Sequence, residues 1–214
     1  ANLNGIWGSS ASDVWIVGDG GTIRHWSNDG TERWEIVPSP TKENLRAVWG
    51  TSPTDAWAVG DAGTILHWDG KTWSFATATL PVGPKPRLYG IWGSGPNDVW
   101  VVGSAGTIAH FDGTTWTTIP SGTKETLRAV WGSSATDVWV VSTPGVLLHG
   151  NGWNAGTASF DLAPEIPRVV DNVATLTLAV WGSSPDDVWL GGEPMPLDWD
   201  LSEHAPAWRK ADPG

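Results

Sequence analysis

The residue types that could do chemistry in this chain, histidine and aspartate, recur at matching positions along the sequence. Four histidines each stand near the end of a similar apolar run: His25, His67, His110 and His149. To share one metal ion, their ring nitrogens would have to come within about 2 Å of it. Each histidine belongs to a different sequence repeat, on a strand that we expect to lie far from the centre of the fold. We therefore expect structural hydrogen bonds from these side chains, and we predict no metal site and no cofactor.

Aspartates recur as well, each directly before a Val-Trp or Ala-Trp pair: Asp13, Asp55, Asp98, Asp137 and Asp187. Calcium takes about six to eight oxygen ligands, with several carboxylates converging on the ion. Only Asp187 has an acidic neighbour among these residues, Asp186. An aspartate that closes a turn accepts hydrogen bonds from backbone N–H groups. We predict that these carboxylates fix turns.

Sequence motifs of the common hydrolases are missing. The chain has no Gly-x-Ser-x-Gly segment, no phosphate-binding loop and no His-Glu-x-x-His segment. These would have indicated a serine hydrolase, a nucleotide hydrolase or a zinc protease. Glycoside hydrolysis would require two carboxylates that face each other across a sugar. We predict that the protein is not an enzyme, with glycoside hydrolysis as a distant alternative.

The elements that must position these side chains are copies of one tryptophan-rich unit. Trp7, Trp49, Trp92, Trp131 and Trp181 follow one another at steps of 42, 43, 39 and 50 residues. In the second copy, short β-rich runs at 45–49, 56–59, 64–68 and 72–75 are separated by turn-forming residues, including Asp69-Gly70. Four short strands per roughly 40–45 residues are typical of a β-propeller blade. The sequence predicts an all-β, five-bladed β-propeller of four-stranded antiparallel blades.

The predicted propeller is a single domain, 1–214. We expect its blades near 1–42, 43–85, 86–124, 125–175 and 176–214. The third residue of each first strand is small: Gly5, Ala47, Gly90, Ala129 and Ala179. Small residues suit the crowding of first strands near the axis. The tryptophan two residues later faces the same side of the strand, where it can fill the space between neighbouring blades.

Two segments depart from the repeat. Residues 154–176 form an insertion, and the last copy replaces its third strand with a proline-containing run at 192–199, which excludes a regular central strand. We expect Ala207-Trp208-Arg209 to supply a fourth strand. No strand shared between the two ends of the chain is evident, so closure must depend on packing of the first blade against the fifth. The alternatives are a piece of a longer propeller or association with another copy.

Tryptophans near the loops are the candidate ligand-binding residues. Trp26 and Trp68 end third strands, and Trp34, Trp73, Trp116 and Trp153 follow the last hairpin of their copies. An exposed indole stacks on a sugar ring, and a nearby Asp69 or Asp112 accepts hydrogen bonds from its hydroxyl groups. The alternative is that these rings pack between blades. Repeated sites would make binding multivalent.

A second group of candidates lies on the first strands. Arg46, Tyr89 and Arg128 occupy equivalent positions in successive copies, as do Asn4 and Leu178. We expect these side chains to line or flank the central channel of the propeller.

The blade sequence resembles a known repeat family. Segments Asp55–Trp73 and Asp98–Trp116, and more weakly Asp13–Trp34 and Asp137–Trp153, read Asp-x-Trp-x-Val-Gly-x-x-Gly-Thr-Ile-x-His-Trp-Asp-Gly-x-Thr-Trp or close to it. This pattern is similar to BNR or Asp-box repeats, above all to propellers related to the photosystem II assembly factor. The variant Trp-Gly-Ser-Ser-x-x-Asp-Val-Trp also resembles repeats of exported myxobacterial proteins. The complete Asp-box is not present.

The resemblance implies binding functions of several kinds. Asp-box blades occur in sialidases, sugar-binding proteins and assembly factors. A sialidase would need three clustered arginines and a tyrosine nucleophile, whereas Tyr89 is the single tyrosine and the arginines are scattered. The relatives imply an exported bacterial protein, extracellular, periplasmic or at the cell surface.

Composition narrows the class of partner. The chain has 40% hydrophobic residues, no cysteine and a formal net charge of −11. Such an acidic chain without a basic cluster is a poor partner for nucleic acid or anionic membranes, and we expect no membrane insertion. We predict a lectin-like module that binds carbohydrate at repeated sites. The alternative is a platform for a protein or peptide partner, with its patch at 154–176 or 193–206; an oligomer is compatible with either.

Overall fold

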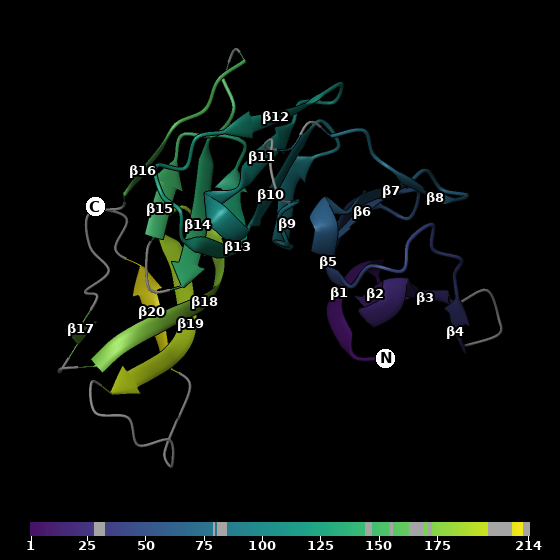
Figure 1. Cartoon of the computed structure of the whole chain (residues 1–214), viewed down its shortest axis with the longest axis horizontal. Coiled ribbons are helices and arrows are strands. Elements are labelled where there is room, and N and C mark those ends of the chain that lie inside the picture. The colour runs from purple at the N-terminus through teal and green to yellow at the C-terminus, as the bar shows by residue number, and fades with distance from the viewer. Residues whose placement is uncertain are drawn as a thin grey trace.

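The computed structural model describes residues 1–27, 33–78, 80, 85–143, 147–154, 156–162, 169–170, 173–196 and 207–211. Its strands form antiparallel sheets that follow one another along an arc (Figure 1). The predicted all-β class and the four-stranded antiparallel sheets are confirmed. Residues 155, 163–168 and 171–172 of the insertion and 197–206 of the irregular segment lie outside the described residues. The docking patch predicted at these segments therefore lies partly outside them.

The first four sheets repeat one plan, in which each strand pairs with its neighbour in sequence. The first sheet contains β1 (Leu3–Ser10), β2 (Asp13–Gly18), β3 (Thr22–Ser27) and β4 (Arg33–Ile36), and the second β5 (Leu45–Ser52), β6 (Asp55–Gly60), β7 (Ile65–Trp68) and β8 (Trp73–Phe75). The third contains β9 (Leu88–Gly95), β10 (Asp98–Gly103), β11 (Ile108–Phe111) and β12 (Trp116–Ile119), and the fourth β13 (Thr126–Ser134), β14 (Asp137–Thr143), β15 (Leu147–Gly150) and β16 (Phe160–Leu162). Short 3-10 turns, η1 (Asp19–Gly21), η2 (Asp61–Gly63) and η3 (Ser104–Gly106), join the second and third strands of the first three sheets.

The last sheet also pairs neighbours in sequence, but one strand precedes its inner strand. Its strands are β17 (Val169–Val170), β18 (Val173–Ser184), β19 (Asp187–Pro196) and β20 (Ala207–Ala211), in that order across the sheet. β19 continues through Pro194 and Pro196, where it pairs with β18 on one side only, because β20 pairs with β19 no further than Gly192. The prediction that the prolines exclude a regular central strand there is confirmed, although the run is still part of a strand. Lys210 pairs with Trp189, the register that a histidine of the third strand occupies in the other sheets, so β20 is in third place and not fourth.

Glycine and tryptophan hold neighbouring sheets together. A Cβ atom on Gly5 would lie 3.0 Å from the Cα atom of Ala47, and one on Gly90 would lie 3.1 Å from that of Ala129. The first strands therefore approach backbone to backbone, as the small residues predict. The first-strand tryptophan of each sheet lies over a glycine of the next, and the atoms of its ring fill the place of a side chain. These pairs are Trp7 with Gly50, Trp49 with Gly93, Trp92 with Gly132, and Trp131 with Gly182.

Most of the core lies between sheets. One cluster combines Trp15 and Val17 of β2 with Leu45 of β5 and Leu66 of β7, and similar clusters join the second sheet to the third and the third to the fourth. Trp15, Trp100 and Trp139 are at most 2% exposed. Because the second, third and fourth sheets each contribute to two clusters, burial of these rings stabilises the arrangement of sheets as well as each sheet.

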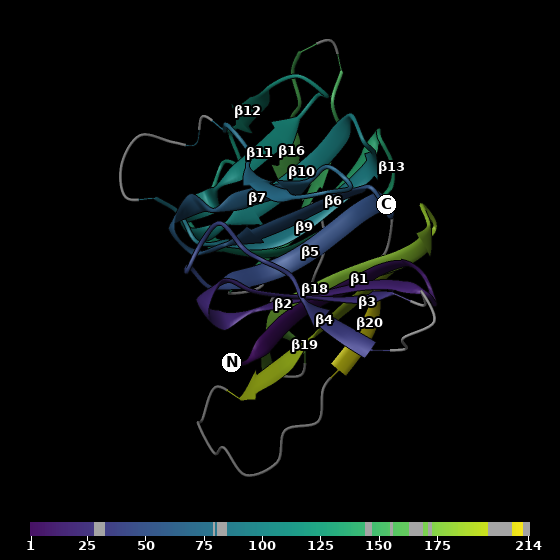
Figure 2. The same cartoon turned by 90° about the vertical axis from the view of Figure 1, so that its right-hand side faces the viewer.

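The arc is open. The inner strands β1, β5, β9, β13 and β18 contact one another in that order, and Figure 1 shows the first and last sheets apart. In Figure 2, which is turned by 90°, the first sheet lies in front of the last one. A closed ring of five blades, which the sequence predicts, is thus not what the structure contains. Tryptophan–glycine contacts join each of the four pairs of successive sheets, from Trp7–Gly50 to Trp131–Gly182.

Candidate binding surface

Each of the first four sheets contains the same polar network, which uses the recurring histidine and aspartate. The Nε2 atom of the histidine lies 2.6 Å from Oδ1 of the aspartate in the pairs His25–Asp13 and His110–Asp98, and 2.7 Å in His67–Asp55 and His149–Asp137. A hydroxyl group at the end of the first strand donates to the other carboxylate oxygen, as from Ser94 to Asp98 at 2.6 Å. The predicted structural hydrogen bonds of the histidines are confirmed.

These networks have catalytic residue types without a catalytic arrangement. Serine and histidine both bind the aspartate, so in the third sheet Ser94 and His110 are joined only through Asp98. A nucleophile relay requires the histidine between the hydroxyl and the carboxylate. The histidine ring instead stacks on the second-strand tryptophan, for example His149 on Trp139 with centroids 3.9 Å apart. The sequence predicts that these aspartates bind backbone N–H groups, whereas the structure shows hydrogen bonds from histidine and hydroxyl side chains.

Asp98 shows the electrostatic balance in such a network. Burial alone would raise the pKa of this carboxyl group. Hydrogen bonds from His110, Ser94 and the indole of Trp100 outweigh burial and hold the pKa of Asp98 below its usual range. An ionised carboxylate only accepts hydrogen bonds, so the Nε2 atom of His110 carries the proton.

The candidate sugar-binding tryptophans divide into buried and accessible rings. Trp73 and Trp116 are 5% and 6% exposed, and each meets the second-strand tryptophan of the preceding sheet edge to face. Trp68 is half-buried, and its indole donates to the carbonyl of Pro53 at 3.1 Å. Trp26 and Trp34 lie 5.8 Å apart in the first sheet, where Trp34 is 38% exposed. The structure therefore does not repeat an exposed ring from sheet to sheet.

The fourth sheet explains the position of Trp153. Gly150 stands where the second and third sheets have Trp68 and Phe111, and Phe160 pairs with it in the register that Trp73 and Trp116 occupy. The fourth strand thus begins at Phe160, seven residues after the predicted position. The ring of Phe160 lies against Gly150, where a side chain would otherwise stand, and Trp153 stacks on His110 of the third sheet with ring centroids 4.4 Å apart.

The two candidate aspartates of the last hairpins serve the backbone. The Oδ1 atom of Asp69 accepts hydrogen bonds from the N–H groups of Lys71 and Thr72, both at 2.8 Å. Asp112 does the same with Thr114 and Thr115. These bonds lower the pKa of both carboxyl groups. In both residues, Oδ1 accepts the hydrogen bonds of the turn, and Oδ2 is the oxygen that can contact a ligand.

The first-strand candidates do come together. Tyr89 on β9 lies between Arg46 on β5 and Arg128 on β13, with the guanidinium carbon atoms 5.6 Å and 4.5 Å from the centre of its ring. The three residues are half-buried and occupy equivalent positions on neighbouring inner strands. Cations over a tyrosine face are held by its quadrupole. We call Arg46, Tyr89 and Arg128 the inner cluster.

Asp61 at the start of η2 anchors one side of the inner cluster. Arg46 donates to both of its carboxylate oxygens at 2.8 Å, Asn44 donates at 3.2 Å, and Arg87 lies 3.9 Å away. Hydrogen bonding and charge from Arg46 hold the pKa of Asp61 below its usual range. The sequence analysis missed Asp61, although its place in the Asp-x-Gly turn of the repeat, shared with Asp19, would have been a signal.

Arg128 has a different environment. Its Nε atom donates to the hydroxyl of Thr143 at 3.1 Å. Among the residues that the structure describes, it forms no ion pair with a carboxylate. The charges of the group are three guanidinium cations, at Arg46, Arg87 and Arg128, against the carboxylates of Asp61 and of Asp19, which also interacts with Arg46. This end of the inner strands therefore carries a small excess of positive charge in a chain whose net charge is −11.

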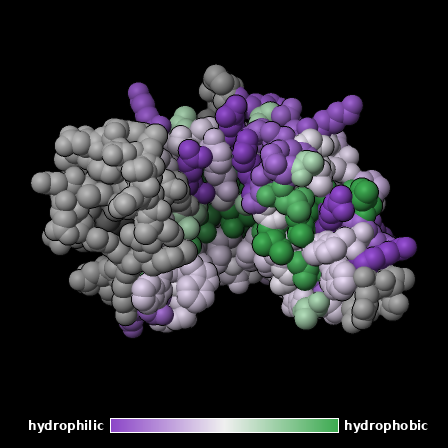
Figure 3. All heavy atoms as spheres, turned by 90° about the horizontal axis from the view of Figure 1, so that it is seen from below, coloured by the Kyte–Doolittle hydropathy of each residue, from purple (hydrophilic) through white to green (hydrophobic). Residues whose placement is uncertain are grey.

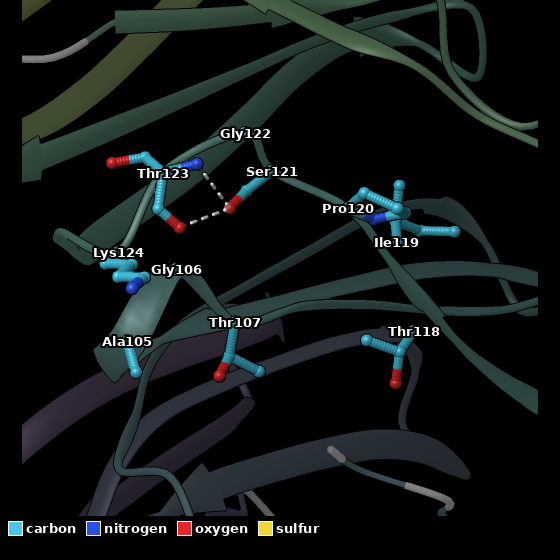
Figure 4. A pocket seen from close by; sticks show the side chains of 10 residues that line it. All are labelled: Ala105, Gly106, Thr107, Thr118, Ile119, Pro120, Ser121, Gly122, Thr123 and Lys124. Carbon is cyan, nitrogen blue, oxygen red and sulfur yellow. Dashed lines mark hydrogen bonds between the residues drawn. The ribbon is translucent and has the colours of Figure 1, made fainter.

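A pocket with a volume of about 400 Å³ lies beside the loop from β12 to β13 (Figure 4). Its wall is formed by the residues around η3 and by the loop, with the hydroxyl of Ser121 bound to the backbone of Thr123. Lys124 is the one titratable residue of the lining. The pocket offers hydroxyl groups and a cation, which suits weak polar contact and not acid–base chemistry.

Within the described ranges, no three side chains of the metal-binding types come close enough to hold an ion. Over the same residues, no helix has the length and apolar character that crossing a membrane requires.

Comparison with known proteins gives the fold family of the arc. No protein-family model and no curated protein sequence matches the chain. Solved structures do. The structure of YCF48 bound to D1 peptide is 19% identical with a TM-score of 0.63, over 91% of this chain and 64% of that one. The β-propeller domain of Myceliophteria thermophila Cps50 (Swd1) is 10% identical with a TM-score of 0.67, over 99% and 73%.

The WD40 repeats of RRP9 are similar as well, at 12% identity and a TM-score of 0.69, over 92% of this chain and 62% of that one. The chain thus spans less than two thirds of the YCF48 and RRP9 structures. Likeness at these identities is a likeness of fold. The structure and these neighbours together show that the chain is built from β-propeller repeats.

Proposed function

We propose that this chain is a non-enzymatic recognition module that binds a peptide or protein segment bearing a carboxylate at the inner cluster. The observation that carries this proposal is Tyr89 held between Arg46 and Arg128 across three neighbouring inner strands. The positions belong to different sheets, so a ligand that contacts all three residues runs along the ends of β5, β9 and β13. An extended segment of polypeptide has the length to do so.

The chemistry of the inner cluster favours an anionic group. A guanidinium ion offers parallel N–H donors that match the two oxygens of a carboxylate. Arg46 already uses such a pair on Asp61, whereas Arg128 has only the hydroxyl of Thr143 on its Nε atom. Arg128 is therefore the residue that can take a ligand carboxylate. The ring of Tyr89 supplies an adjoining apolar contact with a polar edge.

Two further observations support a polypeptide over other ligands. Among the fold neighbours, YCF48 is solved with a D1 peptide bound. The repeated lectin sites that the sequence predicts would use Trp73 and Trp116, whose rings are enclosed between sheets. The exposed pair at Trp26 and Trp34 is one site and not a repeated one. The overall negative charge continues to disfavour nucleic acid.

The test is fluorescence anisotropy with labelled peptides that differ in the number and position of acidic residues and in a free or amidated C-terminus. We expect acidic peptides to bind and Arg128→Gln to weaken them by about tenfold or more, because a charge-assisted hydrogen bond contributes about 1.5–3 kcal/mol. The control is Arg24→Gln, which removes an exposed arginine on β3 and should leave binding unchanged. Added salt should weaken binding.

Equal binding by the Arg128→Gln and Arg24→Gln variants would contradict the proposed site. A second arm uses a glycan array with the same protein. If the protein binds a neutral sugar, and both free sugar and the Trp34→Ala substitution abolish this binding, the carbohydrate-binding hypothesis would be supported at the first sheet.

A further inference from the structure

The loops that join the first four sheets carry a lysine at one position of the repeat. Each lysine stands three residues before a buried leucine at the start of the next inner strand, and four residues before a member of the inner cluster. We call these residues the loop lysines: Lys42, Lys85 and Lys124. The repeat that places Arg46, Tyr89 and Arg128 on neighbouring strands therefore also places one lysine in the loop before each of them.

The loop lysines recur in loops of different sequence. Lys42 and Lys124 each stand in a Thr-Lys-Glu segment, where the glutamate N–H binds the threonine hydroxyl at 3.0 Å and 3.1 Å. Lys85 stands in a longer loop, 76–87, between Pro84 and Pro86. A lysine at the same distance from the inner strand in both kinds of loop is not explained by the way either loop turns.

Hydrogen bonds to the 3-10 turns hold these loops at the end of the sheets where the inner cluster lies. Gly63 of η2 donates its backbone N–H to the carbonyl of Pro86 at 2.6 Å. Gly106 of η3 donates to the carbonyl of Glu125 at 2.8 Å. Each of these carbonyls belongs to the residue directly after a loop lysine. In the first loop, the Oδ1 atom of Asn44 accepts a hydrogen bond from the backbone of η1 at 2.9 Å.

The charges of the loop lysines are exposed and not neutralised by ion pairs. All three side chains are exposed, and none forms a salt bridge with a described residue. The loops 37–44, 76–87 and 120–125 contain four cations, including Arg87, against the carboxylates of Glu43 and Glu125. The field of such exposed charges reaches into solvent over about 10 Å at 0.1 M salt.

The opposite end of the same sheets is acidic. The second strands begin there with an aspartate and run toward the inner cluster; these residues are Asp13, Asp55, Asp98 and Asp137. Hydrophilic and hydrophobic residues are also segregated on the surface seen from below, where hydrophilic ones gather along the upper edge (Figure 3). Because the net charge of the chain is −11, most of the protein repels an acidic ligand. The loops are where such a ligand meets an excess of positive charge.

We propose that the loop lysines are a steering surface that guides an acidic polypeptide to Arg128. This inference rests on the proposed function, because it concerns the partner of the same site. Charge complementarity defines that partner as a segment with several acidic residues around the carboxylate that Arg128 binds. Exposed charges at the rim of an interface act mainly on the rate of association and its salt dependence. Arg128 is half-buried and hydrogen-bonded to Thr143, so it acts mainly on dissociation.

Stopped-flow fluorescence with a labelled peptide that carries several acidic residues measures the two rates separately. It is run at about 0.01 M and about 0.15 M salt, where the screening length is about 30 Å and about 8 Å. The combined variant Lys42→Gln, Lys85→Gln and Lys124→Gln should associate about tenfold more slowly than the wild type at the lower salt. The difference should shrink at the higher salt, and the dissociation rate should change little. Arg128→Gln should mainly raise the dissociation rate.

Two controls separate charge from other effects of substitution. The combined variant with arginine at all three positions retains the charge and should associate at the wild-type rate. Lys71→Gln removes an exposed lysine from the hairpin between β7 and β8, at the acidic end of the second sheet. It should slow association less than the matched single variant Lys124→Gln.

The outcomes distinguish this inference from the proposed function. If the peptide binds the wild type and the glutamine triple variant associates as fast as Lys71→Gln, the loop lysines do not steer, whereas the site at Arg128 stands. A triple variant that changes only the dissociation rate would also overturn the inference, because it would make the lysines contacts of the bound state. If no acidic peptide binds the wild type, the proposed function and the steering surface are both wrong.

Discussion

Two alanines in this chain occupy the left-handed region of backbone conformation, and exchanging them for glycine tests how the turn between second and third strands is stabilised. Ala62 and Ala105 have φ values of 54° and 55°, and Gly20 has 65° at the equivalent position of the first sheet. The three turns are otherwise alike, each with a threonine after the glycine that ends the turn. The same turn position therefore holds alanine in two sheets and glycine in one.

The magnitude follows from two opposing effects. An L-residue with a Cβ atom has a cost of about 1–2 kcal/mol in the left-handed region. Replacing alanine with glycine removes this cost. The substitution also makes the unfolded chain more flexible, which offsets about 0.4–1 kcal/mol of the stabilisation. Ala105 is exposed, so removing its methyl group loses little burial. We expect Ala105→Gly to raise the free energy of unfolding by roughly 0.5–1 kcal/mol, although glycine usually destabilises regular structure.

Gly20→Ala is the reciprocal variant. A Cβ atom built on Gly20 has no heavy atom within 4 Å, so no clash contributes. We expect this variant to lose roughly 0.5–1 kcal/mol from backbone conformation alone. Urea unfolding followed by tryptophan fluorescence measures both, with midpoints moving in opposite directions at a constant m-value. Thermal midpoints should move by roughly 1–4 °C. If Ala105→Gly destabilises and Gly20→Ala does not, the left-handed conformation does not set the energy of this turn.

Three other predictions follow from the packing and the polar networks. Asp98 has a folded-state pKa below its usual value, so its stabilising effect is present above the unfolded pKa of about 3.9 and is lost as pH falls through the folded pKa. Asp98→Asn should therefore have a lower free energy of unfolding than the wild type near neutral pH. In acid unfolding titrations, the difference between the two proteins should shrink. Trp100→Ala should lose about 3–5 kcal/mol in urea unfolding, because the ring is completely buried, whereas Trp181→Ala, measured at low concentration, should change stability by less than about 0.5 kcal/mol; similar losses would refute the burial pattern. Gly93→Ala would place a Cβ atom 2.4 Å from the backbone oxygen of Asp98 and 2.6 Å from the ring of Trp49, and it should cost about 1–3 kcal/mol. Gly95→Ala, with no atom within 4 Å, should be nearly neutral in the same assay.

Local rules within one repeat account for the part of the fold that the sequence predicts well. Strands, hairpins and the small residues of the inner strands follow from alternation, from Asp-Gly turns and from the spacing of tryptophans, all of which act over a few residues. The polar networks were predicted in part. The histidines were assigned to structural bonds, but their aspartate partners were assigned to turns, because a sequence does not show that residues of adjacent strands meet side by side.

The irregular repeats were predicted less well. Phe160 was missed as the start of a strand because nine residues separate it from Gly150, its pairing partner. Trp153 was taken for that strand because tryptophan fills the position in other copies. Likewise, the proline-containing run at 192–199 was expected to exclude only a regular central strand, and nothing in the sequence indicates that its first residues, through Pro196, extend β19 in a long hairpin with β18. In each case, tertiary pairing overrides the local preference of the chain.

The sequence by itself determined the repeating unit, because each copy carries its own turn residues, its own histidine–aspartate pair and its own alternation of apolar side chains. Only the tertiary structure decided how the copies combine. The sequence predicts that the first-strand tryptophans lie between blades, but contacts such as Trp49 over Gly93 join residues of different repeats, and neither repeat alone shows the angle at which two sheets meet. That angle leaves the arc open, places Tyr89 between Arg46 and Arg128, and exposes Ile6 at one end and Trp181 at the other.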